Sequence, residues 1–174
     1  MRTFELKHAS CANQEVDVVV NAANRYLASG GGICGVIFSK AGRDELTNEC
    51  KQLKTPLKDG EVAITSSCKM KNCKAIIHAV GPNFSETPYA MNELFQAYYH
   101  ALETLHRCHY HSISFPLISS GIFAGNLKDP VKVSASQCFA AYKKFVFEHP
   151  DYEVKVLLCA FTNEEYKEAS KVVV

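Results

Sequence analysis

The sequence predicts an α/β fold in which strands and helices form a layered sandwich. Runs of apolar and β-branched residues alternate along the chain with segments of helical periodicity. One run, residues 18–20, is Val-Val-Val without polar alternation, which is typical of a strand covered on both faces in a parallel sheet. The chain has 174 residues, 47% of them hydrophobic, and no composition shift that would mark a linker, so residues 1–174 are expected to form one domain.

The predicted elements follow one another with short connections. Strands are expected at residues 3–7, 16–21, 61–66, 75–80, 112–116 and 153–160, and helices at residues 33–42, 43–54, 88–109, 130–149 and 163–172. Pro88 and Pro130 suit the first turn of their helices, where a missing N–H costs nothing. Thr162 is expected to cap the last helix, because Glu164 and Glu165 follow it and favour the positive end of the helix dipole.

The connection after the second strand predicts an anion-binding turn. Gly30, Gly31 and Gly32 remove every Cβ from the turn, which permits positive φ and lets a ligand approach the backbone amides. The helix that follows is expected to place Ile33, Val36, Ile37 and Ala41 on one face, and the free amides of its first turn would point toward an anion. Both this loop and the glycine-bearing segment 119–125 follow strands directly, so they are expected to face the same crevice.

Two asparagines flank this turn, and they are expected to differ in role. The sequence has neither G-x-G-x-x-G nor Gly-Lys-Ser/Thr, so neither common phosphate fingerprint applies. A short amide both donates and accepts hydrogen bonds, as sugar hydroxyls require. Asn21 is expected to stabilise its own turn, whereas Asn24, beside the glycines, is expected to contact a ligand.

Composition and charge exclude several functions. The net charge is +1 with no basic stripe, so nucleic acid is an unfavoured partner. No apolar stretch approaches the roughly 20 residues of a membrane span, and no signal-peptide core is present, so a cytoplasmic protein without membrane contact is expected. The eight cysteines, such as Cys138 and Cys159, lie mostly in apolar segments and suit buried thiols better than disulfides. A monomer without a cofactor is expected.

Metal chemistry is not indicated. Histidines and cysteines gather at residues 100–111, and Cys68 lies near Cys73, but neither group has the paired spacing of a zinc site. His78, inside an apolar strand, is expected to be a core histidine with satisfied hydrogen bonds rather than a catalytic base.

Several separated motifs resemble the macrodomain family, an ADP-ribose-binding module, over nearly the whole chain. They are V-N-A-A-N at residues 20–24, G-G-G at 30–32, the strand pair at 60–65 and 75–82, and the loop F-P-L-I-S-S-G-I-F at 115–123. The resemblance implies a three-layer α-β-α sandwich with a central mixed, mostly parallel sheet. It also implies ADP-ribose or ADP-ribosylated proteins as partners.

The resemblance assigns a ligand-binding role to residues at both ends of the expected crevice. Ser119, Ser120, Gly121, Ile122 and Phe123 would wrap the diphosphate, with Gly121 permitting the curvature and Phe123 near the distal ribose. Phe161 looks like the family's aromatic platform for adenine, although a core position is an equal alternative. The full set is Ser10, Cys11, Asn24, Gly30, Gly31, Gly32, Ile33, Cys34, Ser119, Ser120, Gly121, Ile122, Phe123 and Phe161.

Three departures from the family pattern bear on base recognition and chemistry. Ser10 stands where the family usually carries the aspartate that accepts from the adenine amino group, and a hydroxyl is the weaker acceptor. Cys34 replaces the aspartate, and Phe38 the histidine, of the MacroD-type hydrolases; Cys34 is expected to be a packing residue more than a nucleophile. The paired glutamates of poly-ADP-ribose glycohydrolases are missing from residues 33–40, so chain cleavage is not expected.

The resulting hypothesis is a weak hydrolase. The chain would bind ADP-ribose and remove mono-ADP-ribosyl groups, or the acetyl group of O-acetyl-ADP-ribose, by substrate-assisted attack of water. The catalytic positions would be Asn24, Gly32 and Cys34, with Asn24 orienting the distal ribose. A non-catalytic ADP-ribose reader is the first alternative, and a binder of another nucleotide or single-stranded RNA is the second.

Overall fold

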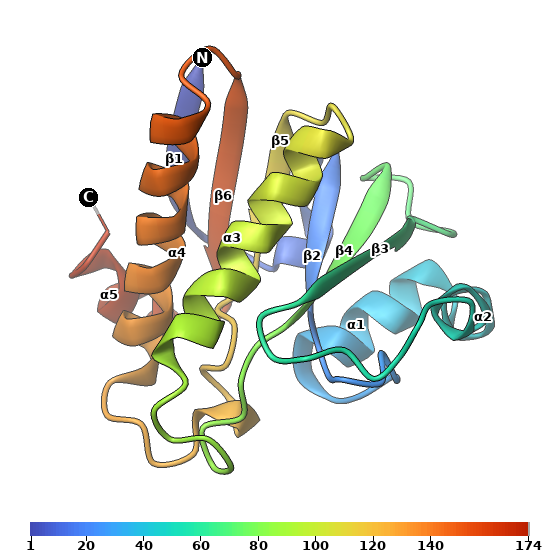
Figure 1. Cartoon of the computed structure of the whole chain (residues 1–174), viewed down its shortest axis with the longest axis horizontal. Helices are drawn as coiled ribbons and strands as arrows, with labels where there is room; N and C mark the ends of the chain where they lie inside the picture. Colours follow the sequence, from blue (N-terminus) through green and yellow to red (C-terminus); the bar gives the residue numbers. More distant parts are fainter. Residues whose placement is uncertain (174) are drawn as a thin grey trace.

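A computed structural model describes residues 1–173, in which five helices and two 3-10 turns surround a six-stranded sheet (Figure 1). The strands are β1 (Arg2–His8), β2 (Val18–Ala23), β3 (Val62–Ser66), β4 (Ala75–Val80), β5 (Ser112–Phe115) and β6 (Val154–Ala160). The helices are α1 (Gly32–Ala41), α2 (Arg43–Lys51), α3 (Met91–Arg107), α4 (Pro130–Glu148) and α5 (Asn163–Ser170), and the 3-10 turns are η1 (Cys11–Asn13) and η2 (Ile122–Ala124).

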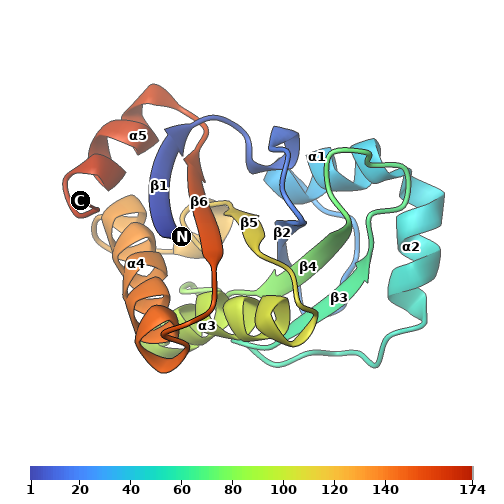
Figure 2. The ribbon, with the colours of Figure 1, turned by 90° about the horizontal axis from the view of Figure 1, so that it is seen from above.

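The sheet has the strand order β1-β6-β5-β2-β4-β3, and only the edge pair β3–β4 is antiparallel. Helices α3 and α4 cover one face, α1 and α2 the other, and α5 lies beside β1 at the edge (Figure 2). The prediction of a three-layer sandwich with a mixed, mostly parallel sheet is therefore confirmed. Because the parallel strands end at one edge, the loops after β1, β2, β5 and β6 meet there.

Several boundaries differ from the prediction, and two of the differences change where a named residue lies. Strand β2 runs two residues further than expected, through Ala23, because its register with β4 continues to the pair Ala23 and Val80. Helix α3 begins at Met91, so Pro88 lies in the preceding turn rather than in the helix. By contrast, Pro130 opens α4, and Thr162 forms a complete capping box with Glu165 at the start of α5, as expected.

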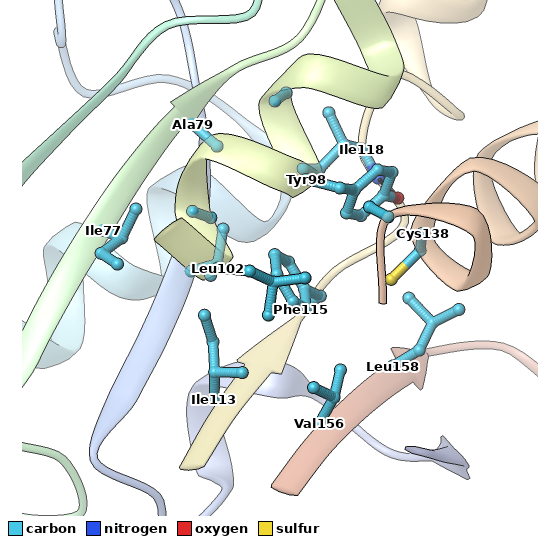
Figure 3. Close-up of a cluster of buried hydrophobic side chains, with 14 of the residues drawn as sticks. Ile77, Ala79, Tyr98, Leu102, Ile113, Phe115, Ile118, Cys138, Val156 and Leu158 are labelled. Atoms are coloured by element: carbon cyan, nitrogen blue, oxygen red, sulfur yellow. Dashed lines mark hydrogen bonds between the residues drawn. The ribbon is translucent and has the colours of Figure 1, made fainter. Parts of the chain in front are cut away.

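The face under α3 and α4 holds a large apolar core (Figure 3). Tyr98 and Phe115 are fully buried there, with their ring centroids 5.3 Å apart at an angle of 65°. The tilted arrangement of two aromatic rings adds stabilisation beyond the area that they bury.

The face under α1 and α2 has a different composition. Helix α1 buries Cys34, Ile37, Phe38 and Ala41, which corrects the expected stripe: Val36 is 44% exposed, and the stripe is shifted toward Cys34 and Phe38. All eight cysteines of the chain are free thiols, and six of them are buried, as expected.

Within residues 1–173, no helix is long and apolar enough to cross a membrane.

Candidate ligand-binding site

A cavity of about 590 Å³ opens where the loops after β1, β2, β5 and β6 converge. All fourteen residues expected to bind a ligand lie on its wall, so the prediction that the two glycine-bearing loops face one crevice is confirmed. This volume is in the range of small-molecule sites. The wall also contains residues that the sequence analysis did not assign: Ala9, Ala22, Ala23, Val36, Pro116, Leu117, Cys159, Thr162 and Glu165.

The first loop, residues 24–32, is held by the side chain of Asn24. Its Oδ1 accepts from the amides of Tyr26 at 3.1 Å and Ala28 at 3.0 Å, and its Nδ2 donates to the Ala28 carbonyl at 2.9 Å. Asn24 therefore lies on the cavity wall as expected, but the structure gives its amide an additional role in fixing the loop.

The glycines of this loop bring the start of α1 to the cavity. Gly32 has φ +57°, the one positive φ of the three, so the expected left-handed residue is present at this position. Gly35 is also required, because a Cβ there would lie 2.6 Å from the Gly30 carbonyl oxygen. The first-turn amides of Gly32, Ile33 and Cys34 have no intrahelical acceptor, and Gly31 supplies no side-chain cap. An anion at this point would meet unpaired donors and the positive end of the helix dipole.

The second loop, residues 116–125, turns at Ser119 and Gly125, which have φ +60° and +55°. Gly121 has φ −103°, so the positive φ values of this loop fall at Ser119 and Gly125 rather than at Gly121. Ser119 Oγ donates to the Pro82 carbonyl at 2.7 Å, and Ser120 Oγ donates to that of Leu117 at 2.8 Å. Both hydroxyls are thus used to shape the loop, and within residues 1–173 the amides of residues 119–123 donate to no protein acceptor.

This loop rests on a polar group in the otherwise apolar core. The Tyr98 hydroxyl accepts from the Ile118 amide at 2.9 Å and is hydrogen-bonded to Ser134, whose Oγ donates to the Ile118 carbonyl at 2.6 Å. Both side chains are fully buried. Helices α3 and α4 therefore fix the strand end from which the second loop departs.

Cys34 is buried behind the first loop. Its Sγ lies 3.6 Å from the Ala28 carbonyl oxygen and 3.7 Å from Asn21 Nδ2. Burial raises the pKa of this thiol, and the hydrogen bond from Asn21 and the charge of Arg43 oppose the shift without cancelling it. The thiol is neutral at pH 7, which agrees with the expected packing role and gives the helix start no thiolate.

Asn21 does not stabilise its own turn, so that expectation is wrong. It lies within β2, 1% exposed, with Nδ2 3.1 Å from His78 Nδ1, while Thr65 Oγ1 lies 3.0 Å from His78 Nε2. Asn21 Oδ1 has no hydrogen-bond partner among residues 1–173. His78 is the core histidine that the sequence predicts, and burial lowers its pKa to about 4, so it stays neutral. Within residues 1–173, no cluster of His, Cys, Asp and Glu could hold a metal ion.

The far end of the cavity is formed where β1 and β6 end side by side. Phe161 is 72% exposed at the cavity rim, which excludes the alternative of a core aromatic. Ser10 Oγ accepts from the Ala12 amide at 3.3 Å and caps η1. Glu165 also lies on this wall; the pattern T-x-x-E directly after Phe161 was the signal that could have placed it there.

Comparisons with known proteins identify the family. Residues 20–134 match the Macro domain family. The chain is 35% identical to a macro domain-containing protein of Listeria monocytogenes, over 92% of this chain and 90% of that protein. It is 33% identical to the ADP-ribose glycohydrolase MACROD1 of Rattus norvegicus over 87% of this chain, and spans 57% of that relative's length.

Solved structures agree with this result. The Oceanobacillus iheyensis macrodomain with ADP matches with a TM-score of 0.86 and 29% identity, over 98% of this chain and 89% of that one. The Trypanosoma brucei macrodomain in complex with ADP matches with a TM-score of 0.87 and 26% identity, over 99% and 70%. The sequence motifs, the sheet order and these matches lead to one conclusion: this chain belongs to the macro domain family.

Proposed function

We propose that this chain binds ADP-ribose in the 590 Å³ cavity, with the diphosphate held between the first and second loops. The observation that carries the proposal is the convergence of two sets of backbone amides, at residues 32–34 and 119–123, on one cavity. The structures of related macrodomains with ADP, and with ADP-ribose in Trypanosoma brucei, support it.

The proposed phosphate site uses main-chain donors rather than charged side chains. In the part of the chain that the structure describes, no lysine or arginine lies on the cavity wall. Amides and a helix dipole recognise a compact anion at close range. Long-range attraction of a polyanion, by contrast, needs many exposed cations and produces a steep salt dependence. The site therefore fits a diphosphate better than single-stranded RNA.

Calorimetric titration with ADP-ribose tests this proposal, with a variant that fills the proposed phosphate position. Gly31 has φ −88° and ψ −174°, and a Cβ there meets no atom within 4 Å, so Gly31→Val should fold normally. We expect wild-type binding of ADP-ribose that changes little between 50 and about 200 mM salt, weaker binding of ribose 5-phosphate, and at least a tenfold loss of affinity in the variant. Absence of wild-type binding would refute the proposal.

We also propose slow hydrolysis of mono-ADP-ribosyl groups or O-acetyl-ADP-ribose. The 33% identical relative named ADP-ribose glycohydrolase supports this step. The first loop supplies no carboxylate and Cys34 is neutral, so a phosphate oxygen of the substrate would have to orient the attacking water, with Asn24 and Gly32 placing the distal ribose beside it. Release of ADP-ribose from a modified protein should occur in the wild type and fall sharply in Asn24→Ala.

A non-catalytic reader is the second candidate function, and one observation favours it. Asn24 uses its acceptor oxygen twice and its amide nitrogen once within the loop, and residues 24–32 contain no carboxylate or histidine that could serve as a base. Calorimetry and a hydrolysis assay on the same sample distinguish the two candidates. Tight ADP-ribose binding without measurable product would assign the chain to the readers.

A further inference from the structure

The end of the cavity beside β1 and β6 combines an exposed aromatic side chain with a floor of neutral, apolar groups. The Ala9 amide donates to the Ala160 carbonyl at 2.9 Å, which holds the two strand ends together and brings Ser10 and Phe161 to one rim. Cys11 and Cys159 lie on the wall beneath them, and burial raises the pKa of both thiols, that of Cys159 to about 12. The floor is therefore apolar and uncharged, and the exposed side chain of Phe161 lies at its rim.

Among the described residues 1–173, Glu165 supplies the only carboxylate on the cavity wall. Its Oε1 accepts from the amides of Phe161 at 3.1 Å and Thr162 at 2.9 Å, and its own amide donates to Thr162 Oγ1 at 3.1 Å. Two hydrogen bonds thus fix the carboxylate beside the backbone of Phe161, and the third completes the capping box. Within residues 1–173 its second oxygen, Oε2, has no hydrogen-bond or ion-pair partner.

The other polar groups at this end of the cavity are weaker hydrogen-bond acceptors than the Glu165 carboxylate. Ser10 Oγ already accepts from the Ala12 amide, and neutral thiols are weak acceptors. A carboxylate oxygen forms hydrogen bonds about twice as strong as those of neutral acceptors. An exposed aromatic ring, an apolar floor and one fixed strong acceptor match a flat heteroaromatic base that carries an exocyclic amino group.

We propose that Glu165 determines the base specificity of this site: the base stacks on Phe161, and its amino group donates to Glu165 Oε2. The inference rests on the proposed ADP-ribose binding and names the residue that would distinguish adenine from a base with a carbonyl in the same place. Hypoxanthine would place a carbonyl oxygen against the carboxylate, so two acceptors would face each other without a proton between them.

The experiment compares calorimetric affinities for ADP-ribose and for its analogue with hypoxanthine in place of adenine. Wild type should prefer the adenine ligand by at least about tenfold, the effect of one hydrogen bond to a charged group. Glu165→Gln keeps the capping box, because glutamine serves at this position, but it presents an N–H toward the base. In this variant, the ratio of the affinity for the adenine ligand to that for the hypoxanthine ligand should fall to about one or reverse.

Glu164→Gln is the matched control, since it removes the same charge from the first turn of α5 at an exposed residue outside the cavity wall. It should keep the wild-type ratio, and melting temperatures verify that both variants fold. Equal affinity of the wild type for the two ligands, or an unchanged ratio in Glu165→Gln, would overturn this inference while leaving ADP-ribose binding intact. Absence of binding for both ligands would instead refute the proposed function.

Discussion

The two faces of the sheet differ in what they bury, and each supports one of the two loops. The face under α3 and α4 is packed with Leu, Ile, Phe and Tyr side chains, and its central buried polar pair, Tyr98 and Ser134, lies where the second loop departs. The face under α1 and α2 holds five buried cysteines and the chain Asn21–His78–Thr65 behind the first loop. Alternate residues of the same strands create this division, because β2 sends Val18 and Val20 to one face and Val19 and Asn21 to the other.

The difference shows how stability and site construction are divided in this fold. Large side chains on the α3 and α4 face bury the greater apolar area per residue and so stabilise the domain most. Small thiols and buried polar groups on the face under α1 and α2 contribute less, and Asn21 Oδ1, which no group within residues 1–173 satisfies, costs stability. That face instead allows the glycine-rich loop to lie close against the sheet.

The largest expected change in stability follows from a substitution on the face under α3 and α4. Phe115→Ala should lower the free energy of unfolding by about 3–5 kcal/mol, because it leaves a large cavity beside Tyr98. Cys50→Ala, on the opposite face, should lower it by about 1 kcal/mol. Urea denaturation measures both values. Equal losses would show that the two faces share the stabilisation evenly.

The second prediction concerns the face under α1 and α2 and the dependence of the free energy of unfolding on pH. Buried His78 has a pKa of about 4 against 6.5 in the unfolded chain, so its contribution is fully present above pH 6.5 and is lost as the pH falls toward 4, because the unfolded chain takes up the proton first. The loss should reach about 3 kcal/mol. Denaturation of His78→Gln, which keeps a donor and an acceptor, should lack this pH dependence. Parallel pH profiles for both proteins would contradict the burial of a neutral His78.

A smaller effect is expected where the apolar face meets the second loop. Tyr98→Phe removes the hydroxyl that accepts from the Ile118 amide, and should lower the free energy of unfolding by about 1–2 kcal/mol. It should also weaken ADP-ribose binding several-fold, because the loop loses its support. Phe115→Leu, in the same core but without a bond to the loop, is the control. An unchanged affinity in Tyr98→Phe would show that ADP-ribose binding does not depend on this hydrogen bond between the core and the second loop.

The smallest effect concerns the thiols. At pH 7, iodoacetamide should label exposed Cys108 readily, while buried Cys34, Cys11 and Cys159, whose pKa values are raised, should react at least about tenfold more slowly. Mass spectrometry of the labelled protein gives the order. Labelling of Cys34 before Cys108 would contradict this prediction, because it would indicate that Cys34 is a reactive thiolate able to act as a nucleophile.

The fold was predictable from the sequence because apolar runs, glycines and caps each act locally. The run at residues 18–20, Pro130 and the Thr162 cap all took the predicted positions. The two asparagines were harder, since their roles depend on where β2 ends: pairing with β4 through Ala23 buries Asn21 and leaves Asn24 to fix the loop. Glu165 was missed as a wall residue because its position depends on β6 ending beside β1.

The central claim is that backbone amides of two loops hold one diphosphate. A titration of ¹⁵N-labelled protein with ADP-ribose, followed by amide chemical shifts, tests it most directly. The largest shifts should fall together at residues 30–34 and 119–123, with saturation at one common dissociation constant. Shifts confined to one loop, or concentrated outside this cavity, would contradict the account.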